Sequence, residues 1–200
     1  MSAFNPPSFG DEIDQLLAPA RLSPLGPGEP NVAVREQLQA LSIDRLFGRQ
    51  AVDREQPVDR KMASACLAGL WLYHGFLEES HTISQQIETR EGSYWHGLMH
   101  RREPDYANAK YWFRRVGEHP IGDELASAAR ELAGTGELDA ASKFLAGQTR
   151  WDHFRFVDLC EAAANGHSAS GPLCRRIQER EWWLLFGYCY DRACSRNHKG

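Results

Sequence analysis

The stretch from Gly92 to Pro120 reads GSYWHGLMHRREPDYANAKYWFRRVGEHP, and it predicts two helices joined by a tight turn. Ser93 is a favourable N-cap for a first helix that runs to about Glu103. Pro104 ends this helix, because the residue before a proline is pushed out of the α conformation. The sequence therefore predicts both ends of the first helix.

The second helix of this stretch is bounded equally well. Asp105 can cap it, and it continues to Val116. Gly117 ends it, and Pro120 follows three residues later, which is a common order of helix stop signals. We expect the two helices to pack antiparallel, since the connection between them is short.

The same block resembles a single tetratricopeptide-type helical hairpin. That repeat combines small residues, an Asp-Tyr pair, an aromatic residue and a closing proline, places that are taken here by Gly97, Asp105, Tyr106, Ala109, Phe113 and Pro120. The proline comes one residue early, and only a faint second copy follows at residues 136–145. At least three copies are normally needed for a stable solenoid. We therefore expect a compact multi-helix domain that contains one such hairpin, and not a long solenoid.

The rest of the chain also predicts an all-α fold. Ala, Leu, Glu and Arg are abundant, and no stretch alternates strictly enough to indicate a strand. The helix expected at Arg60–Glu79 is apolar nearly all round and should be central. Residues 81–87 either extend it or start a short helix. Further helices are expected at Asp11–Leu17, Val32–Phe47 with a stop at Gly48, Asp123–Leu132, Glu137–Leu145, Asp152–Ala164 and Leu173–Cys194.

A proline- and glycine-rich segment, Pro19–Pro30, suggests two parts in the chain. We expect residues 1–31 to form a short helix and an irregular arm, and residues 32–200 to form a single helical domain. Near the C-terminus Trp182 and Trp183 are adjacent, so one helix face cannot bury both, and we expect one of them to be at least half exposed.

Composition limits the class of protein. The net charge of −4 provides no overall basic field, so no nucleic-acid partner is expected. The five cysteines are odd in number and form no C-x-x-C, which favours reduced thiols in the cytoplasm. The N-terminus does not resemble a signal peptide, and no apolar stretch is long enough to cross a membrane.

The block 93–117 and its approach SHTISQQIETREG also resemble a family of uncharacterised bacterial and fungal helical proteins. The resemblance extends to REWWLLFGYCYDRA near the C-terminus and covers about half of the chain. It implies a shared fold and no particular activity.

A histidine pattern marks a candidate metal site. His96, His100 and Glu103 fall at i, i+4 and i+7 of one helix, which places them on one stripe. Two imidazoles one turn apart can bind a divalent transition metal, and His81 or His74 could supply a third ligand. The alternative is that these histidines only hydrogen-bond to neighbouring helices.

A second candidate site is rich in arginine and aromatic side chains. It would consist of Arg101, Arg102, Tyr111, Trp112, Arg114 and Arg115. Arginine forks bind carboxylate or phosphate, and the aromatic rings can stack on a ligand, so the partner would be a small anion or a protein. The alternative is that the arginines form structural ion pairs with Glu91, Glu103, Asp105 and Glu118.

Two functions follow from these two sites. The chain has no G-x-G-x-x-G, P-loop or G-x-S-x-G motif. We therefore expect a non-catalytic helical binding protein that uses the arginine- and aromatic-rich hairpin surface. The alternative is a metal-dependent, hydrolase-like enzyme with a histidine site on the helix 93–103. The sequence leaves open the reaction, the partner and the oligomeric state.

Overall fold

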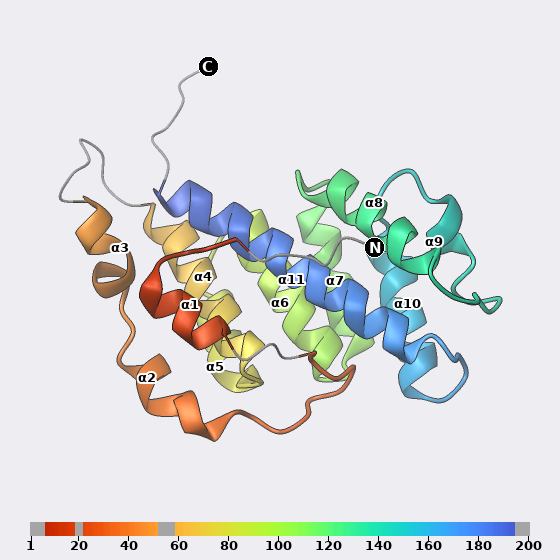
Figure 1. The fold of residues 1–200 in the computed structure, drawn as a ribbon, viewed down its shortest axis with the longest axis horizontal. Helices are drawn as coiled ribbons and strands as arrows, with labels where there is room; N and C mark the ends of the chain where they lie inside the picture. The colour runs from red at the N-terminus through yellow and green to blue at the C-terminus, as the bar shows by residue number, and fades with distance from the viewer. Residues whose placement is uncertain (1–6, 19–21, 52–58, 195–200) are drawn as a thin grey trace, which may run out of the picture.

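A computed structural model describes residues 7–18, 22–51 and 59–194 of the protein (Figure 1). Within these ranges every regular element is helical and there is no strand, which confirms the all-α prediction. The helices are α1 (Asp11–Leu17), η1 (Val32–Val34), α2 (Arg35–Gln39), α3 (Ile43–Ala51), α4 (Arg60–Tyr73), α5 (Leu77–Ser84), α6 (Arg90–Arg102), α7 (Tyr106–Val116), α8 (Gly122–Ala133), α9 (Phe144–Gly147), α10 (His153–Ala164) and α11 (Gly171–Cys194).

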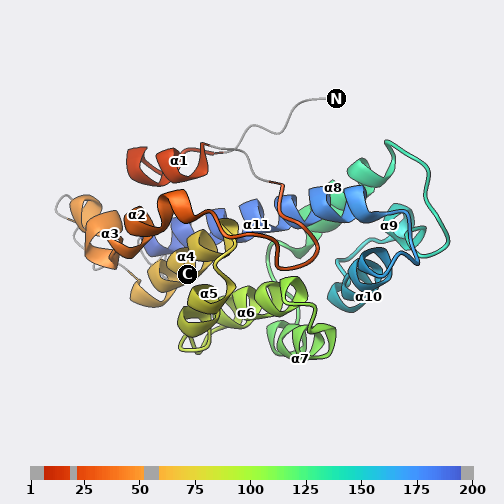
Figure 2. The ribbon, with the colours of Figure 1, turned by 90° about the horizontal axis from the view of Figure 1, so that it is seen from below.

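The long helix α11 runs through the molecule, and the other helices surround it without forming a long solenoid (Figures 1 and 2). Trp182 and Trp183 are both buried, with 6% of each exposed, so the expectation that one is half exposed was wrong. Trp182 donates a hydrogen bond to the carbonyl of Gly69 on α4 at 3.0 Å. Trp183 stacks on Phe9, with ring centroids 6.1 Å apart. Both tryptophans are buried because two different elements cover α11 here.

The helix expected at Arg60–Glu79 is in fact two helices. α4 ends at Tyr73, and Gly75 takes a φ of +81°, which favours glycine. A Cβ on Gly75 would lie 3.3 Å from the carbonyl oxygen of Glu29, so the chain also passes close by. α5 then starts at Leu77 in a new direction. This change of direction determines where His81, a residue of α5, lies.

Three other boundaries differ from the sequence prediction. The helix expected at Val32–Phe47 is broken into η1, α2 and α3, and α3 continues past Gly48. Thr89, and not Ser93, is the N-cap of α6, since its Oγ1 accepts from the amide of Gly92 at 3.2 Å. The region expected as a helix at Glu137–Leu145 forms mostly turns, with only the short α9 at its end.

α6 and α7 form the central hairpin. Asp105 caps α7 as expected, accepting from the amide of Asn108 at 3.1 Å. Gly97 on α6 faces Phe113 on α7, and a Cβ at Gly97 would lie 3.1 Å from the phenyl ring. The helices therefore approach closely at this glycine, while the resemblance to a tetratricopeptide unit stays a prediction.

The described part of the N-terminal segment is packed against the remainder of the chain. Phe9 contacts Phe186 and Tyr190 of α11, with ring centroids 4.8 and 5.0 Å apart. Arg102 donates to the carbonyl oxygens of Gly26 and Pro27 at 3.0 and 2.9 Å. The first helix and part of the arm thus contribute to the same core as α11.

The cysteines and the lengths of the apolar helices are the next features of the described residues. All five cysteines are free, and four of them are buried. None of the helices in the described ranges has the length and apolar character that a membrane crossing requires.

Candidate metal centre

Three histidines from two helices meet on one side of the α5–α6 pair. His81 lies on α5, and His96 and His100 lie one turn apart on α6. One nitrogen from each ring can be chosen so that all three nitrogens lie within 4.8 Å of one another. The ring centroids are 4.5 Å apart for His81–His96, 4.8 Å for His96–His100 and 5.5 Å for His81–His100.

The backbone turn between α5 and α6 brings these histidines together. The break at Gly75 allows α5 to fold back, and α5 then lies beside α6 (Figure 2). The first turn of α6 passes close to the preceding chain, since a Cβ at Gly92 would come within 2.1 Å of the carbonyl oxygen of Ile87. His81 supplies the third ring, as one of the two sequence alternatives. His74, the C-cap residue of α4, lies outside the group, and its Nδ1 is 3.3 Å from Asn31 Nδ2.

The environment keeps the two α6 histidines neutral. His96 and His100 are buried, and His81 is half-buried. Burial, with smaller contributions from His100 and His81, lowers the pKa of His96 to about 3. Burial also lowers the pKa of His100, although Glu103 and Asp105 oppose it. A neutral imidazole has the free lone pair that a metal ion requires, and Nδ1 of His96 is buried with no hydrogen-bond partner among the described residues.

Neighbouring side chains fix the orientation of two of the rings. Trp112 stacks on His96, with centroids 4.0 Å apart and planes inclined by 23°. Glu103 Oε2 lies 3.1 Å from Nδ1 of His100, and Asn108 Nδ2 lies 3.2 Å from its Nε2. Glu103, expected as a ligand, therefore contacts one histidine and lies outside the group of three. A carboxylate on the outer nitrogen of a ligating histidine is a common way to orient the ring.

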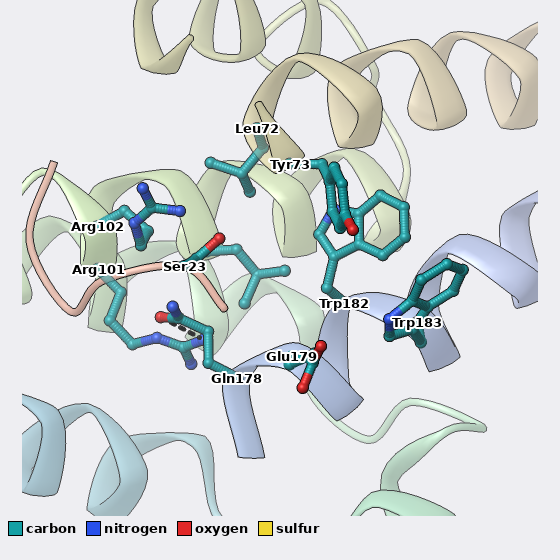
Figure 3. A pocket seen from close by; sticks show the side chains of 10 residues that line it. Ser23, Leu72, Tyr73, Arg101, Arg102, Gln178, Glu179, Trp182 and Trp183 are labelled. Carbon is teal, nitrogen blue, oxygen red and sulfur yellow. Dashed lines mark hydrogen bonds between the residues drawn. The ribbon is translucent and has the colours of Figure 1, made fainter. Parts of the chain in front are cut away.

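The six residues of the expected arginine- and aromatic-rich surface do not gather at one place. Arg101 is 1% exposed and pairs with Glu181, with Nη2 and Oε2 2.5 Å apart. Arg101 and Arg102 line a narrow pocket between α6, α4 and α11 (Figure 3). This pocket has room for little more than one water molecule.

The other members of that set lie elsewhere on the hairpin. Arg114 and Arg115 are exposed at the far end of α7, where they line a different and wider groove. Tyr111 is 48% exposed, whereas Trp112 is half-buried against His96. Trp112 thus belongs to the surroundings of the histidines.

The sequence did not predict the buried polar groups around Glu181. Glu181 on α11 is fully buried and accepts a hydrogen bond from the hydroxyl of Tyr94 at 3.0 Å. Nδ1 of His153 on α10 lies 4.0 Å from the same carboxylate, beyond hydrogen-bond distance, and accepts from Trp151 Nε1 at 3.0 Å. These residues come from three helices, α6 and the two consecutive helices α10 and α11. No local spacing joins them, and nothing in the sequence distinguishes Glu181 from the other charged residues of α11, such as Glu179 and Arg180.

Comparison of the chain with models of known families, with curated proteins and with solved structures gives no match. The two resemblances inferred from the sequence therefore stay predictions.

Proposed function

We propose that the protein binds one divalent transition metal ion, of the zinc class, through His81, His96 and His100. The observation that supports this most strongly is the convergence of three imidazole nitrogens within 4.8 Å of one another. Nitrogens bound tetrahedrally to zinc at about 2.0–2.1 Å are roughly 3.3 Å apart. A rotation of the half-buried His81 side chain toward the other two rings would close the difference.

The donor set favours this class of metal. Imidazole suits zinc and its neighbours in the first transition row, whereas magnesium and calcium prefer oxygen ligands. Glu103 would hold His100 by its Nδ1, so that Nε2 faces the metal after the amide of Asn108 has turned. Trp112 would hold the ring of His96 in place by stacking.

Three histidine ligands would leave a fourth coordination position for water. A metal ion in such a site lowers the pKa of bound water and supplies a hydroxide at neutral pH. The half-buried position of His81 provides the side from which solvent and a substrate could approach. We therefore favour the metal-dependent, hydrolase-like alternative over the non-catalytic binding protein. The binding surface has less support, because Arg101 and Arg102 are occupied by contacts within the chain.

Metal content and cobalt spectroscopy test the proposal. The full chain, purified without chelator, should contain or take up one equivalent of zinc by elemental analysis. Changing His81, His96 or His100 to alanine should weaken zinc binding at least a hundredfold in a chelator competition. His167→Ala is the matched control, because His167 is exposed and lies outside the cluster. A wild type that takes up no stoichiometric metal, or variants that bind zinc as tightly as the control, would overturn the proposal.

A second measurement distinguishes an open site from a closed one. Cobalt(II) in a tetrahedral site gives intense visible absorption, and azide changes that absorption when a coordination position is open. We expect such a change with the cobalt-loaded wild type. An unchanged spectrum would contradict the enzymatic part of the proposal and leave a structural metal site.

A further inference from the structure

A wide groove separates the end of α7 from the start of α10, and it is independent of the three histidines. We name it the α7–α10 groove. The residues that matter for its chemistry are Arg114, Arg115, Arg150, Trp151, His153 and Phe154. Its lining comes from the start of α6, the end of α7, residues 117–120, the start of α8, and residues 150–154 at and before the start of α10.

Four arginines and three carboxylates line the groove, Arg90, Arg114, Arg115 and Arg150 against Glu118, Asp123 and Asp152, so positive charge is in slight excess. Among the described residues, no carboxylate forms an ion pair with Arg114 or Arg115, both of which are exposed. Arg150 pairs with Glu118 at the rim. Asp152 is used as the N-cap of α10, where its side chain accepts from two backbone amides. This local excess contrasts with the net charge of −4 of the whole chain.

A buried histidine, His153, also lines the groove. His153 is 8% exposed, and its Nδ1 accepts from Trp151 Nε1 at 3.0 Å. Because Nδ1 is an acceptor, the proton of the neutral ring is on Nε2. No described residue accepts a hydrogen bond from Nε2. Burial, then Arg101 and His119, lowers the pKa of His153 to about 3, so the ring is a neutral donor at physiological pH.

Two aromatic side chains, Trp151 and Phe154, line the groove beside the arginines and His153. Phe154 is 38% exposed, and Trp151 is half-buried. The guanidinium of Arg114 lies 5.8 Å from the ring centroid of Phe154, so the charged and the apolar parts are adjacent. A ligand that combined an anionic group with a flat apolar group would contact both.

We propose that the α7–α10 groove binds a small phosphate monoester whose organic part is aromatic. Arg114 and Arg115 contact the phosphate oxygens, since guanidinium forks match phosphate geometry. Nε2 of His153 donates to a third oxygen, and Phe154 and Trp151 contact the organic part. The proposal stands without a metal ion at the histidine cluster, so the two can fail separately.

Calorimetry with phenyl phosphate tests the groove in the wild-type full chain. EDTA is present, so that binding to a metal ion cannot contribute, and ionic strength is held constant. We expect saturable binding of phenyl phosphate, weaker binding of inorganic phosphate and none of phenol. The double variant Arg114→Gln/Arg115→Gln should weaken binding of phenyl phosphate at least tenfold. Arg60→Gln is the matched control, because Arg60 is exposed, pairs with Asp44 and lies outside the groove.

Nitrogen-15 spectra of the histidine side chains test the position of the ligand. We expect His153, assigned with a His153→Phe variant, to show the Nε2–H tautomer and to shift when phenyl phosphate is added. Equal binding by the double variant, or no saturable binding by the wild type, would overturn the proposal. An unshifted His153 resonance would also overturn it, because binding would then occur elsewhere.

Discussion

Arg101 on α6 and Glu181 on α11 form an ion pair in which both side chains are removed from solvent, being 1% and 0% exposed. The guanidinium of Arg101 also lies over the ring of Phe156, 4.8 Å from its centroid. Phe156 belongs to the smaller hydrophobic cluster of α8, α10 and α11, whereas Tyr94 beside Glu181 belongs to the larger one. The pair therefore lies where the two apolar clusters meet.

Removing one partner of this pair should destabilise the fold strongly. Arg101→Met and Glu181→Leu should each cost about 3–5 kcal/mol of unfolding free energy, because each leaves a buried charge without its partner. The double variant should recover much of that loss, since it leaves neither charge. Urea denaturation of the four proteins measures the coupling. Losses that simply add in the double variant would show that the two residues act independently.

Gly97 and Gly69 should differ in their tolerance of a side chain. Gly97→Leu should cost about 1–3 kcal/mol by overpacking against Phe113. A Cβ at Gly69 would lie 2.8 Å from the ring of Trp95, closer than the 3.1 Å at Gly97. We therefore expect Gly69→Ala to lower the melting temperature more than Gly97→Ala. Gly147→Ala is the control, because nothing lies near its Cβ position. The reverse order of the two alanine variants would contradict this packing.

Glu103 should affect metal affinity through His100. Its carboxylate lies 3.1 Å from Nδ1 of that ring, and loss of such a partner typically weakens metal binding by about 10–100-fold. We expect a loss of this size for Glu103→Gln in zinc competition. Glu88→Gln, which changes an exposed glutamate outside the cluster, should have no effect. Equal affinities for the two variants would show that Glu103 does not position His100.

His153 should make the fold sensitive to acid. Its pKa is lowered to about 3 in the folded chain, while an unfolded histidine titrates near 6.5. Between these values the unfolded chain binds one proton more, so stability is lost as the pH falls below about 6.5. His153→Gln should reduce the slope of unfolding free energy against pH by about 1.4 kcal/mol per pH unit in this window. Denaturant titrations from pH 4 to 7 measure the slope, and a slope matching that of His167→Gln would refute the assignment.

Local signals predicted much of the fold and part of the candidate site. Asp105 and Pro104 set the hairpin boundaries, and the spacing of His96 and His100 placed both rings on one face. The sequence could not decide between His81 and His74, because that choice depends on the change of direction at Gly75. The sequence also could not predict the contacts of Arg101 and Gly69. Their partners, Glu181 and Trp182, lie on α11, far along the chain.

The contact between Phe9 and α11 also bears on how the chain folds as it is synthesised. Phe9 is synthesised 174 residues before its partner Trp183 (183 − 9). At roughly 5–20 residues per second, the interval between them is on the order of ten seconds or more. During that time the apolar face of α1 has no partner from α11. Native packing around α11 is therefore a late event, and the emerging chain offers chaperones an apolar N-terminal segment to hold.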